Sequence, residues 1–316
     1  MSKKRLAFSG ILIGMSASAL MQTLVATSLP VIVRELGGIH LYTWVFAGYM
    51  LASTITIPLF GRLADLVGRR TLYISGLVLF LVASALVGQA QSMAQVVAFR
   101  ILQGIGAGAV APAALAAIGD LFGEQERGKI FGIIGAVQVL ANLIGPPLGG
   151  WITDTFSWRW GFYLVLPIGV VALLLTWIGL DDKTLPSEWR NLSIDWLGAF
   201  GIGAALCAGL VGLQWVGAGN TQSTLGIFLV IFAGIMLVFS LRWERNHPDP
   251  VMPIALLRHP SMWKAALGTL LLGMITNSAI AYFPLYLEKI HAQSATETGF
   301  ALIPMLLLAG VGSGLG

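Results

Sequence analysis

The sequence predicts an all-α integral membrane protein with about ten transmembrane helices. Of its 316 residues, 57% are hydrophobic and only 10% are charged, whereas soluble domains carry about 25% charged residues. The mean hydropathy is +0.85. The apolar residues form long continuous runs without alternation, which favours helices over the strands of a membrane barrel. Roughly 20 apolar residues, at about 1.5 Å rise each, cross the hydrocarbon core, so each run is long enough to span it.

The expected spans are read from these runs in chain order. The first begins after Lys3-Lys4-Arg5 and is too long for a cleaved signal peptide, so we interpret it as an uncleaved span. The ten predicted segments lie near 8–33, 42–60, 71–90, 94–118, 130–152, 161–180, 195–216, 223–242, 264–287 and 298–316.

The distribution of basic residues predicts the orientation. With the N-terminus inside, 14 of the 18 Lys and Arg residues fall in inner loops, three in outer loops, and Arg100 within a span. Cytoplasmic loops carry such an excess, so we expect a multi-pass protein of the inner or plasma membrane with a cytoplasmic N-terminus. Because the basic residues are confined to short loops, the basic balance does not indicate nucleic acid as a partner. The single cysteine, Cys207, allows no internal disulfide and no multi-thiolate metal site, and no metal or cofactor is expected.

A basic decapeptide, Gly61-Arg62-Leu63-Ala64-Asp65-Leu66-Val67-Gly68-Arg69-Arg70, separates the second and third spans. We interpret it as a tight polar loop whose glycines permit a sharp turn. Its aspartate is expected to accept hydrogen bonds from helix-start amides or to pair with a neighbouring arginine. The candidate latch residues are Gly61, Asp65, Gly68, Arg69 and Arg70.

Arg100 lies about seven residues inside the fourth span, followed by Gln103 and Gly104. A central arginine costs roughly 2.5 to 3.5 kcal/mol on translocon scales. Two readings remain open: the side chain extends to the outer surface, or it is a buried cation that organises a polar, proton-responsive cluster. Gly104, Gly106 and Gly108 are expected to form one smooth face for a neighbouring helix.

The fifth span carries Gly145-Pro146-Pro147-Leu148-Gly149-Gly150. Proline removes a backbone donor and glycine permits close packing, so a bend and a tight helix contact are expected.

Together these motifs resemble the major facilitator superfamily of transporters. The decapeptide resembles the loop between its second and third helices, and Arg100-x-x-Gln103-Gly104 resembles its fourth-helix motif. Gly145-Pro146-x-x-Gly149-Gly150 is similar to the fifth-helix motif associated with exporters. Residues 20–30, Leu-Met-Gln-Thr-Leu-Val-Ala-Thr-Ser-Leu-Pro, resemble the first span of the fourteen-span drug:proton antiporter (EmrB/QacA-like multidrug efflux) subfamily.

The resemblance implies a helical bundle with about ten of an expected fourteen helices, in a chain truncated at its C-terminal end. The implied division is a six-helix half over 1–190, two linker helices over 191–245, and the start of a second half over 246–316. The decapeptide would act as an inner latch between the halves.

The implied activity is secondary transport: proton-coupled efflux of drug-like or amphipathic molecules by alternating access. The alternatives are a carrier of a metabolite, such as an organic acid or siderophore, and a membrane scaffold or sensor. An embedded enzyme is disfavoured because the four histidines, His40, His247, His259 and His291, are scattered among loops.

One position departs from the subfamily: Met21 stands where its members usually have an intramembrane aspartate. No carboxylate is expected well inside a span. The acid could therefore lie elsewhere in the carrier, Asp65 or Arg100 could act indirectly, or transport could be uncoupled from protons.

A central cavity is expected to collect polar and aromatic side chains, although interhelical hydrogen bonding would explain them equally well. Few charges and many aromatics suit a bulky apolar or cationic solute. The expected partners are the lipid bilayer, a small-molecule substrate and protons. The candidate cavity residues are Gln22, Thr23, Tyr49, Gln138, Asn142, Asn277 and Tyr282.

Overall fold

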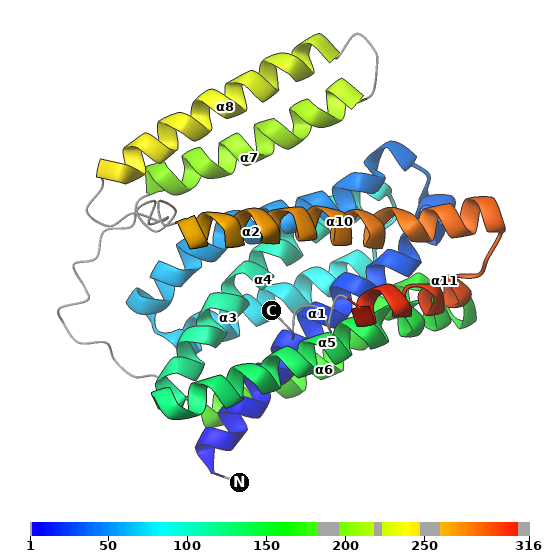
Figure 1. Cartoon of the computed structure of the whole chain (residues 1–316). Coiled ribbons are helices and arrows are strands. Elements are labelled where there is room, and N and C mark those ends of the chain that lie inside the picture. Colours follow the sequence, from blue (N-terminus) through cyan, green and yellow to red (C-terminus); the bar gives the residue numbers. More distant parts are fainter. Residues whose placement is uncertain (1, 182–195, 218–222, 247–259, 309–316) are drawn as a thin grey trace.

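The computed structural model describes residues 2–181, 196–217, 223–246 and 260–308, and all regular structure in these ranges is helical (Figure 1). Nine helices there are long and apolar enough to cross a membrane. The elements are α1 (Lys3–Leu36), η1 (Ile39–Leu41), α2 (Tyr42–Val67), α3 (Arg69–Gly88), α4 (Met93–Leu121), α5 (Glu124–Thr155), α6 (Trp158–Gly179), α7 (Trp196–Gly217), α8 (Ser223–Asn246), α10 (Pro260–His291) and α11 (Ala295–Ala301).

The helices follow the predicted segments but extend further at most ends. The tenth predicted segment, near 298–316, corresponds to a helical stretch that starts with α11 at Ala295, where Ser294 and Glu297 form a capping box. The apolar helical stretch is described only as far as Leu308. The predicted boundary near residue 190, and His247 and His259, lie outside the described residues.

The decapeptide is not the ten-residue loop predicted from its composition. Residues 61–67 continue α2, and α3 begins at Arg69, so only Gly68 interrupts the two helices. Gly68 has φ +99°, a conformation that residues with a side chain rarely adopt. Gly61 is helical, and a Cβ on it would meet only Pro112 at 3.9 Å. The turn therefore depends on Gly68 and not on Gly61.

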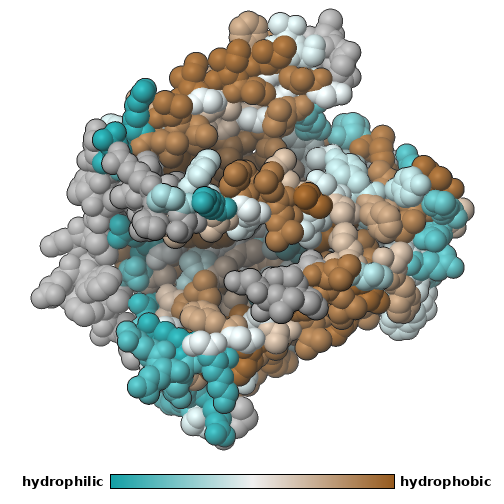
Figure 2. Space-filling view, viewed as in Figure 1, coloured by the Kyte–Doolittle hydropathy of each residue, from teal (hydrophilic) through white to brown (hydrophobic). Residues whose placement is uncertain are grey.

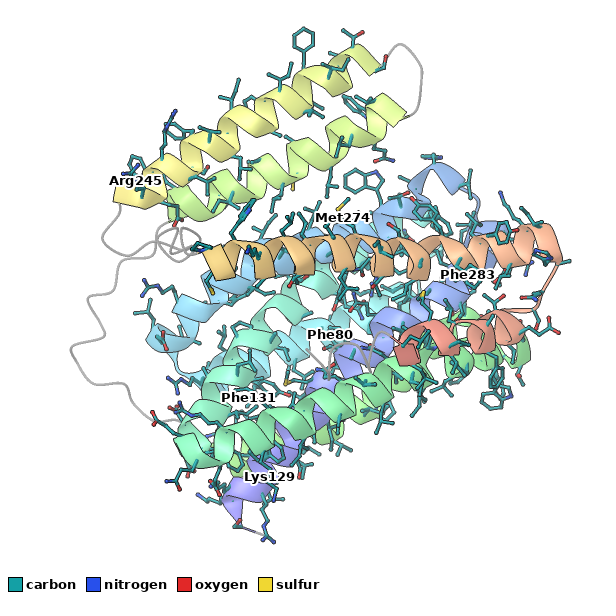
Figure 3. All side chains as sticks on the ribbon, in the orientation of Figure 1. Phe80, Lys129, Phe131, Arg245, Met274 and Phe283 are labelled. Atoms are coloured by element: carbon teal, nitrogen blue, oxygen red, sulfur yellow. The ribbon has the colours of Figure 1, made fainter. Side chains whose placement is uncertain are left out.

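Helices α1 to α6 supply the buried core of the bundle. Its largest cluster joins residues of all six, among them Leu24, Tyr49, Phe80, Ala113 and Phe162. α7 and α8 pack on each other and touch the bundle through α2, while α10 lies against α1 and α11 against α5 (Figures 1 and 3). Between helices in lipid, small residues allow the close approach on which packing depends.

We call the end of the bundle that carries the α2–α3 turn the Gly68 end, and the opposite end the Glu35 end. The Gly68 end also carries the N-terminus, where Lys3 pairs with Asp181 at 2.9 Å and Lys4 with Glu126 at 3.0 Å. The Glu35 end carries the turns after α1, α3 and α5. Figure 2 shows hydrophilic residues gathered near both ends and hydrophobic residues over the surface between them. Large apolar side chains such as Phe228, Ile235 and Ile275 are exposed there, as expected of surfaces facing lipid.

Candidate functional site

Arg69 of the predicted latch joins the ends of two neighbouring helices. Its guanidinium forms a close ion pair with Asp120, at the end of α4, and donates a 3.0 Å hydrogen bond to the carbonyl of Ala116. Asp65 lies 3.8 Å from the same guanidinium, one turn back on α2. Arg70 points elsewhere and stacks over the ring of Trp177 on α6, 4.5 Å from its centroid. Asp120, which closes this network, was not among the residues predicted from the sequence.

Arg100 is fully buried, so the reading in which it extends to the surface is wrong. Its Nε donates to the Val45 carbonyl at 3.3 Å, and Nη1 donates to Gln103 Oε1 at 2.6 Å. Its guanidinium also lies over the Tyr49 ring, 4.2 Å from the centroid. Nη2 of Arg100 and Nε2 of Gln103 have no hydrogen-bond partner among the described residues. The cation is therefore held by a carbonyl, an amide and an aromatic face between α2 and α4.

The α4 glycines pack against two neighbouring helices, whereas one smooth face for a single helix was expected. Cβ atoms on Gly104 and Gly108 would overlap α2, at the carbonyl of Tyr49 and the hydroxyl of Thr56. A Cβ on Gly106 would instead lie 2.6 Å from the Phe80 nitrogen on α3. At about 100° per residue, alternate positions point to different sides of a helix.

The proline-glycine motif brings α5 against two helices. Gly145 would meet Thr23 of α1 with an added Cβ, and Gly149 would meet the Leu24 carbonyl at 2.7 Å. Thr27 Oγ1 donates to the Pro146 carbonyl at 3.2 Å. Gly150 approaches the backbone of α11 instead, at Ala295. α5 continues through both prolines, and the motif forms tight contacts with α1 on one side and α11 on the other.

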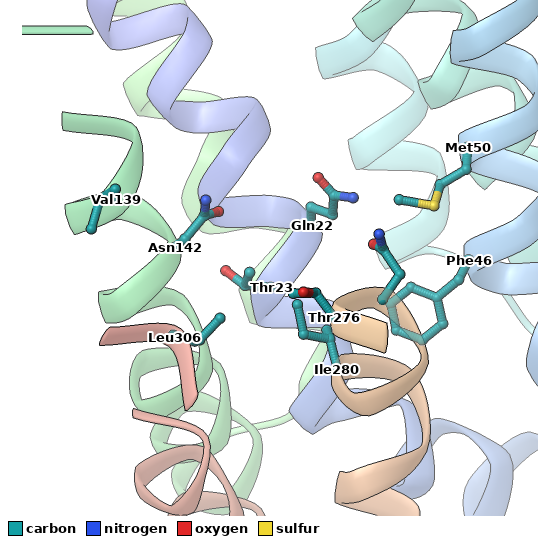
Figure 4. Close-up of a pocket in the computed structure, with 10 residues that line it drawn as sticks. Gln22, Thr23, Phe46, Met50, Val139, Asn142, Thr276, Ile280 and Leu306 are labelled. Atoms are coloured by element: carbon teal, nitrogen blue, oxygen red, sulfur yellow. The ribbon is translucent and has the colours of Figure 1, made fainter. Parts of the chain in front are cut away.

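A cavity of about 300 Å³ lies between α1, α2, α5 and α10, with Leu306 of the stretch after α11 at its edge (Figure 4). Figure 4 shows Gln22, Phe46, Met50 and Asn142 around it, from three of these helices. Its lining is Gln22, Thr23, Phe46, Met50, Val139, Asn142, Thr276, Asn277, Ile280 and Leu306. No charged residue is in this set.

A second cavity, of about 310 Å³, continues along α1, α2, α4 and α5. The two share Gln22, Met50 and Asn142, so they form one hollow between the helices. Tyr49 and Gln138 line the second part, and Tyr49 separates it from Arg100. The structure thus brings together six of the seven residues expected to line a cavity.

Tyr282 lines neither part of the hollow. Its ring stacks on Tyr42 with 6.0 Å between centroids, and its hydroxyl lies 2.8 Å from Thr43 Oγ1. The sequence analysis missed Phe46, Met50, Thr276 and Ile280. The spacing of Phe46, Met50, Ser53 and Ile57 is that of one helix face and was a usable signal.

Carboxylates occupy only the ends of the long helices in the described ranges. Each Asp or Glu lies within four residues of a helix terminus, including Glu244 of α8 and Glu288 of α10, which the predicted spans excluded. Met21 is fully buried in α1. The hollow is therefore lined by neutral amides, hydroxyls, thioethers and apolar groups.

Comparison with known proteins places this architecture in a family. The family model of the Major Facilitator Superfamily matches residues 11–316. The chain is 36% identical over 309 residues to the multidrug transporter protein MdtP of Bacillus subtilis (strain 168), covering 97% of this chain and 56% of that protein. It is also 36% identical over 310 residues to multidrug resistance protein 3 of the same strain, covering 97% of this chain and 60% of that relative. The chain thus spans little more than half the length of these relatives.

A solved structure shares the fold at low identity. A bacterial homologue of the human lysosomal transporter Spinster, in an inward-facing and unoccupied conformation, matches with a TM-score of 0.61 and 14% identity. The match covers 98% of this chain and 61% of that chain. With a family model matching almost its whole length, the chain belongs to the Major Facilitator Superfamily.

Proposed function

We propose that the protein exports drug-like or amphipathic small molecules through the hollow between α1, α2, α5 and α10. The observation that carries this proposal is the lining of that hollow, in which amides alternate with apolar side chains and no charge is present. Ligand sites of this kind are mostly apolar, with a few polar groups that orient the solute. The names of the two Bacillus subtilis relatives support the same substrate class.

Alternating access would open the hollow to one side at a time. α10 touches α2 near the Glu35 end, where Tyr42 Oη donates to the Ala281 carbonyl at 2.7 Å. Toward the Gly68 end, α10 is exposed from Met262 to Leu272. These contacts favour a state that is closed at the Glu35 end, and we take it as the inward-open member of the proposed cycle. Rocking of the α10–α11 side against the six-helix side would reverse it.

The proposed topology places the Gly68 end in the cytoplasm of a cell whose inner or plasma membrane holds the protein. The excess of basic residues at that end supports it; Arg245, at the end of α8, lies at the left of the view in Figure 3. Residues 1–190 would form one transporter half, 191–245 two linker helices and 246–316 the start of the second half. The packing of α7 and α8 mainly on each other, with α2 as the chief contact to the bundle in the described ranges, supports the linker assignment and the fourteen-span drug:proton subfamily.

An organic acid or siderophore carrier is the second candidate. A carboxylate substrate favours Arg or Lys in its site, and the described lining contains neither. Arg100 is the nearest candidate, but it is buried behind Tyr49. Neutral or singly cationic amphipathic solutes fit the lining better. A scaffold or sensor role would not account for the hollow between the helices.

Efflux of a fluorescent cation tests this function. Cells expressing the complete reading frame are loaded with ethidium, and dye loss is followed with and without a protonophore. Active export predicts faster loss than in cells with an empty vector, and proton coupling predicts that the protonophore removes the difference. A carrier that moves citrate but not ethidium in the same cells would favour the second candidate.

A further inference from the structure

The carboxylate of Asp154 joins α5 to α11 across the junction that must part for the Glu35 end to open. Oδ1 accepts a hydrogen bond from the Ala295 amide at 3.3 Å. Oδ2 accepts from the Thr296 amide at 2.8 Å and from Thr296 Oγ1 at 2.6 Å. One side chain therefore receives three hydrogen bonds from the first turn of another helix.

The neighbouring backbones are also in contact, which fixes the distance that the carboxylate spans. A Cβ on Gly150 would overlap the Ala295 carbonyl, and one on Gly299 would overlap the Pro146 carbonyl. Glycine is thus present on both helices where they touch. With no side chains between them, α5 and α11 approach closely enough for a short aspartate to reach the α11 amides.

α11 has a cap of its own besides Asp154. Ser294 Oγ accepts from the Glu297 amide at 3.2 Å, and the Ser294 amide donates to Glu297 Oε2 at 2.9 Å. This capping box satisfies two of the first amides from within the segment. Asp154 accepts hydrogen bonds from the amides of Ala295 and Thr296, which lie between Ser294 and Glu297 in the sequence. Its hydrogen bonds therefore add a connection between α5 and α11 to the cap that α11 already carries.

Other groups at this end do not make the same connection. Glu35 binds Arg159 at 2.5 Å and Trp158 Nε1 at 2.7 Å, which ties α1 to α6 within one side of the bundle. Tyr42 and Thr43 reach α10 through neutral hydrogen bonds. Of the ion pairs and charged hydrogen bonds in the described ranges, those of Asp154 are the ones that cross from α5 to α11.

We infer that Asp154 is a positioning residue that holds the Glu35 end closed by clamping Thr296 and the first amides of α11. The inference rests on the proposed export cycle, in which that end is external and must open to release solute. A negative charge is favourable beside the first amides of a helix, and hydrogen bonds to a carboxylate are stronger than neutral ones. Asp154 is exposed, so its bonds can break and re-form in water during each cycle.

The test reads access to the hollow from outside. A reporter, Ile280→Cys, is placed in a cysteine-free background that includes Cys207→Ser, and intact cells are treated with a membrane-impermeant maleimide. Ile280 lines the hollow, and in the proposed cycle it is reached from outside only when the Glu35 end is open. Asp154→Asn keeps the shape and removes the charge. We expect it to raise the external labelling rate about tenfold, which corresponds to about 1.4 kcal/mol.

Two further variants make the result specific. Thr296→Val removes the hydroxyl donor but keeps the amide, so it should raise labelling by a smaller factor. Glu35→Gln, the matched control, removes a carboxylate from the same end without crossing from α5 to α11 and should leave labelling unchanged. An unchanged rate in both Asp154→Asn and Thr296→Val, or an equal rise in Glu35→Gln, overturns the inference. If labelling shifts as expected while ethidium is not exported, the clamp stands and the proposed function falls.

Discussion

Replacing Gly149 by alanine should weaken the packing of α5 on α1, and the size of the effect follows from three distances. A Cβ at Gly149 would lie 2.7 Å from the Leu24 carbonyl oxygen, 2.8 Å from Leu24 Cγ and 2.9 Å from Thr27 Oγ1. Non-bonded carbon contacts are normally about 3.5 to 4.0 Å. The two helices would have to separate by several tenths of an ångström along this contact.

Gly135 provides a matched control on the same helix, because nothing lies within 4 Å of a Cβ built there. Both substitutions gain the same helix propensity, about 0.8 to 1.0 kcal/mol for Gly to Ala. Only Gly149→Ala adds an overpacking cost, typically about 1 to 3 kcal/mol. That cost is therefore the expected difference in unfolding free energy between the two variants, with Gly149→Ala the less stable.

Thermal unfolding of the purified proteins in one detergent, followed by tryptophan fluorescence, measures this order. Gly135→Ala should unfold at or above the midpoint of the unmodified protein, and Gly149→Ala below it. Equal midpoints for the two variants would show that α1 and α5 are not in backbone contact at Gly149, and the packing argument for the proline-glycine motif would be wrong.

Three other changes test the remaining parts of the site. Arg100→Gln removes the cation from the Tyr49 face and should reduce dye efflux at least tenfold while surface expression is retained; efflux equal to that of the unmodified protein would contradict a functional cluster. Asp120→Asn leaves Arg69 with only the weaker Asp65 contact at 3.8 Å and should slow efflux several-fold. The control Glu126→Gln, at an exposed pair with Lys4, should leave the efflux rate unchanged. Equal effects of the two variants would contradict the latch role. Gly68→Ala forces a side chain into φ +99° and ψ +139°, a sparsely populated conformation that costs about 1 to 3 kcal/mol. The expected result is an unfolding midpoint below that of Gly61→Ala, and equal midpoints would contradict it.

The number and order of the helices followed from hydropathy alone, because a lipid-facing backbone has few alternatives to a helix. The boundaries were less predictable. Composition suggested a ten-residue loop at 61–70, yet α2 and α3 are separated only by Gly68. Charged side chains at a helix end are compatible with helix, so polarity did not mark where the helix stopped.

The candidate site was predictable where residue type was unusual for its surroundings. Arg100, Gln22 and Asn142 stood out as polar residues within apolar runs, and the structure places them beside or around one hollow. Ile280 was not found, since a single apolar residue in an apolar helix carries no signal until its neighbours are known. Phe46 was signalled only by the helix face that it shares with Met50, Ser53 and Ile57.

Partners distant in sequence were the least predictable. Asp120 with Arg69, and Asp154 with Thr296, depend on which helix ends meet, and that is decided by packing across the bundle. The α4 glycines illustrate the same limit: their spacing predicted close packing, but not that Gly106 faces α3 while Gly104 and Gly108 face α2.

The most direct test of the central claim is binding of ethidium to the purified protein, measured by fluorescence polarisation. The account predicts that Gln22→Leu combined with Asn142→Leu, which removes both amides shared by the two parts of the hollow, weakens binding about tenfold. The control Thr269→Val, at an exposed position of α10, should bind as the unmodified protein does. Undiminished affinity in the double variant would show that the solute binds elsewhere and would contradict the account.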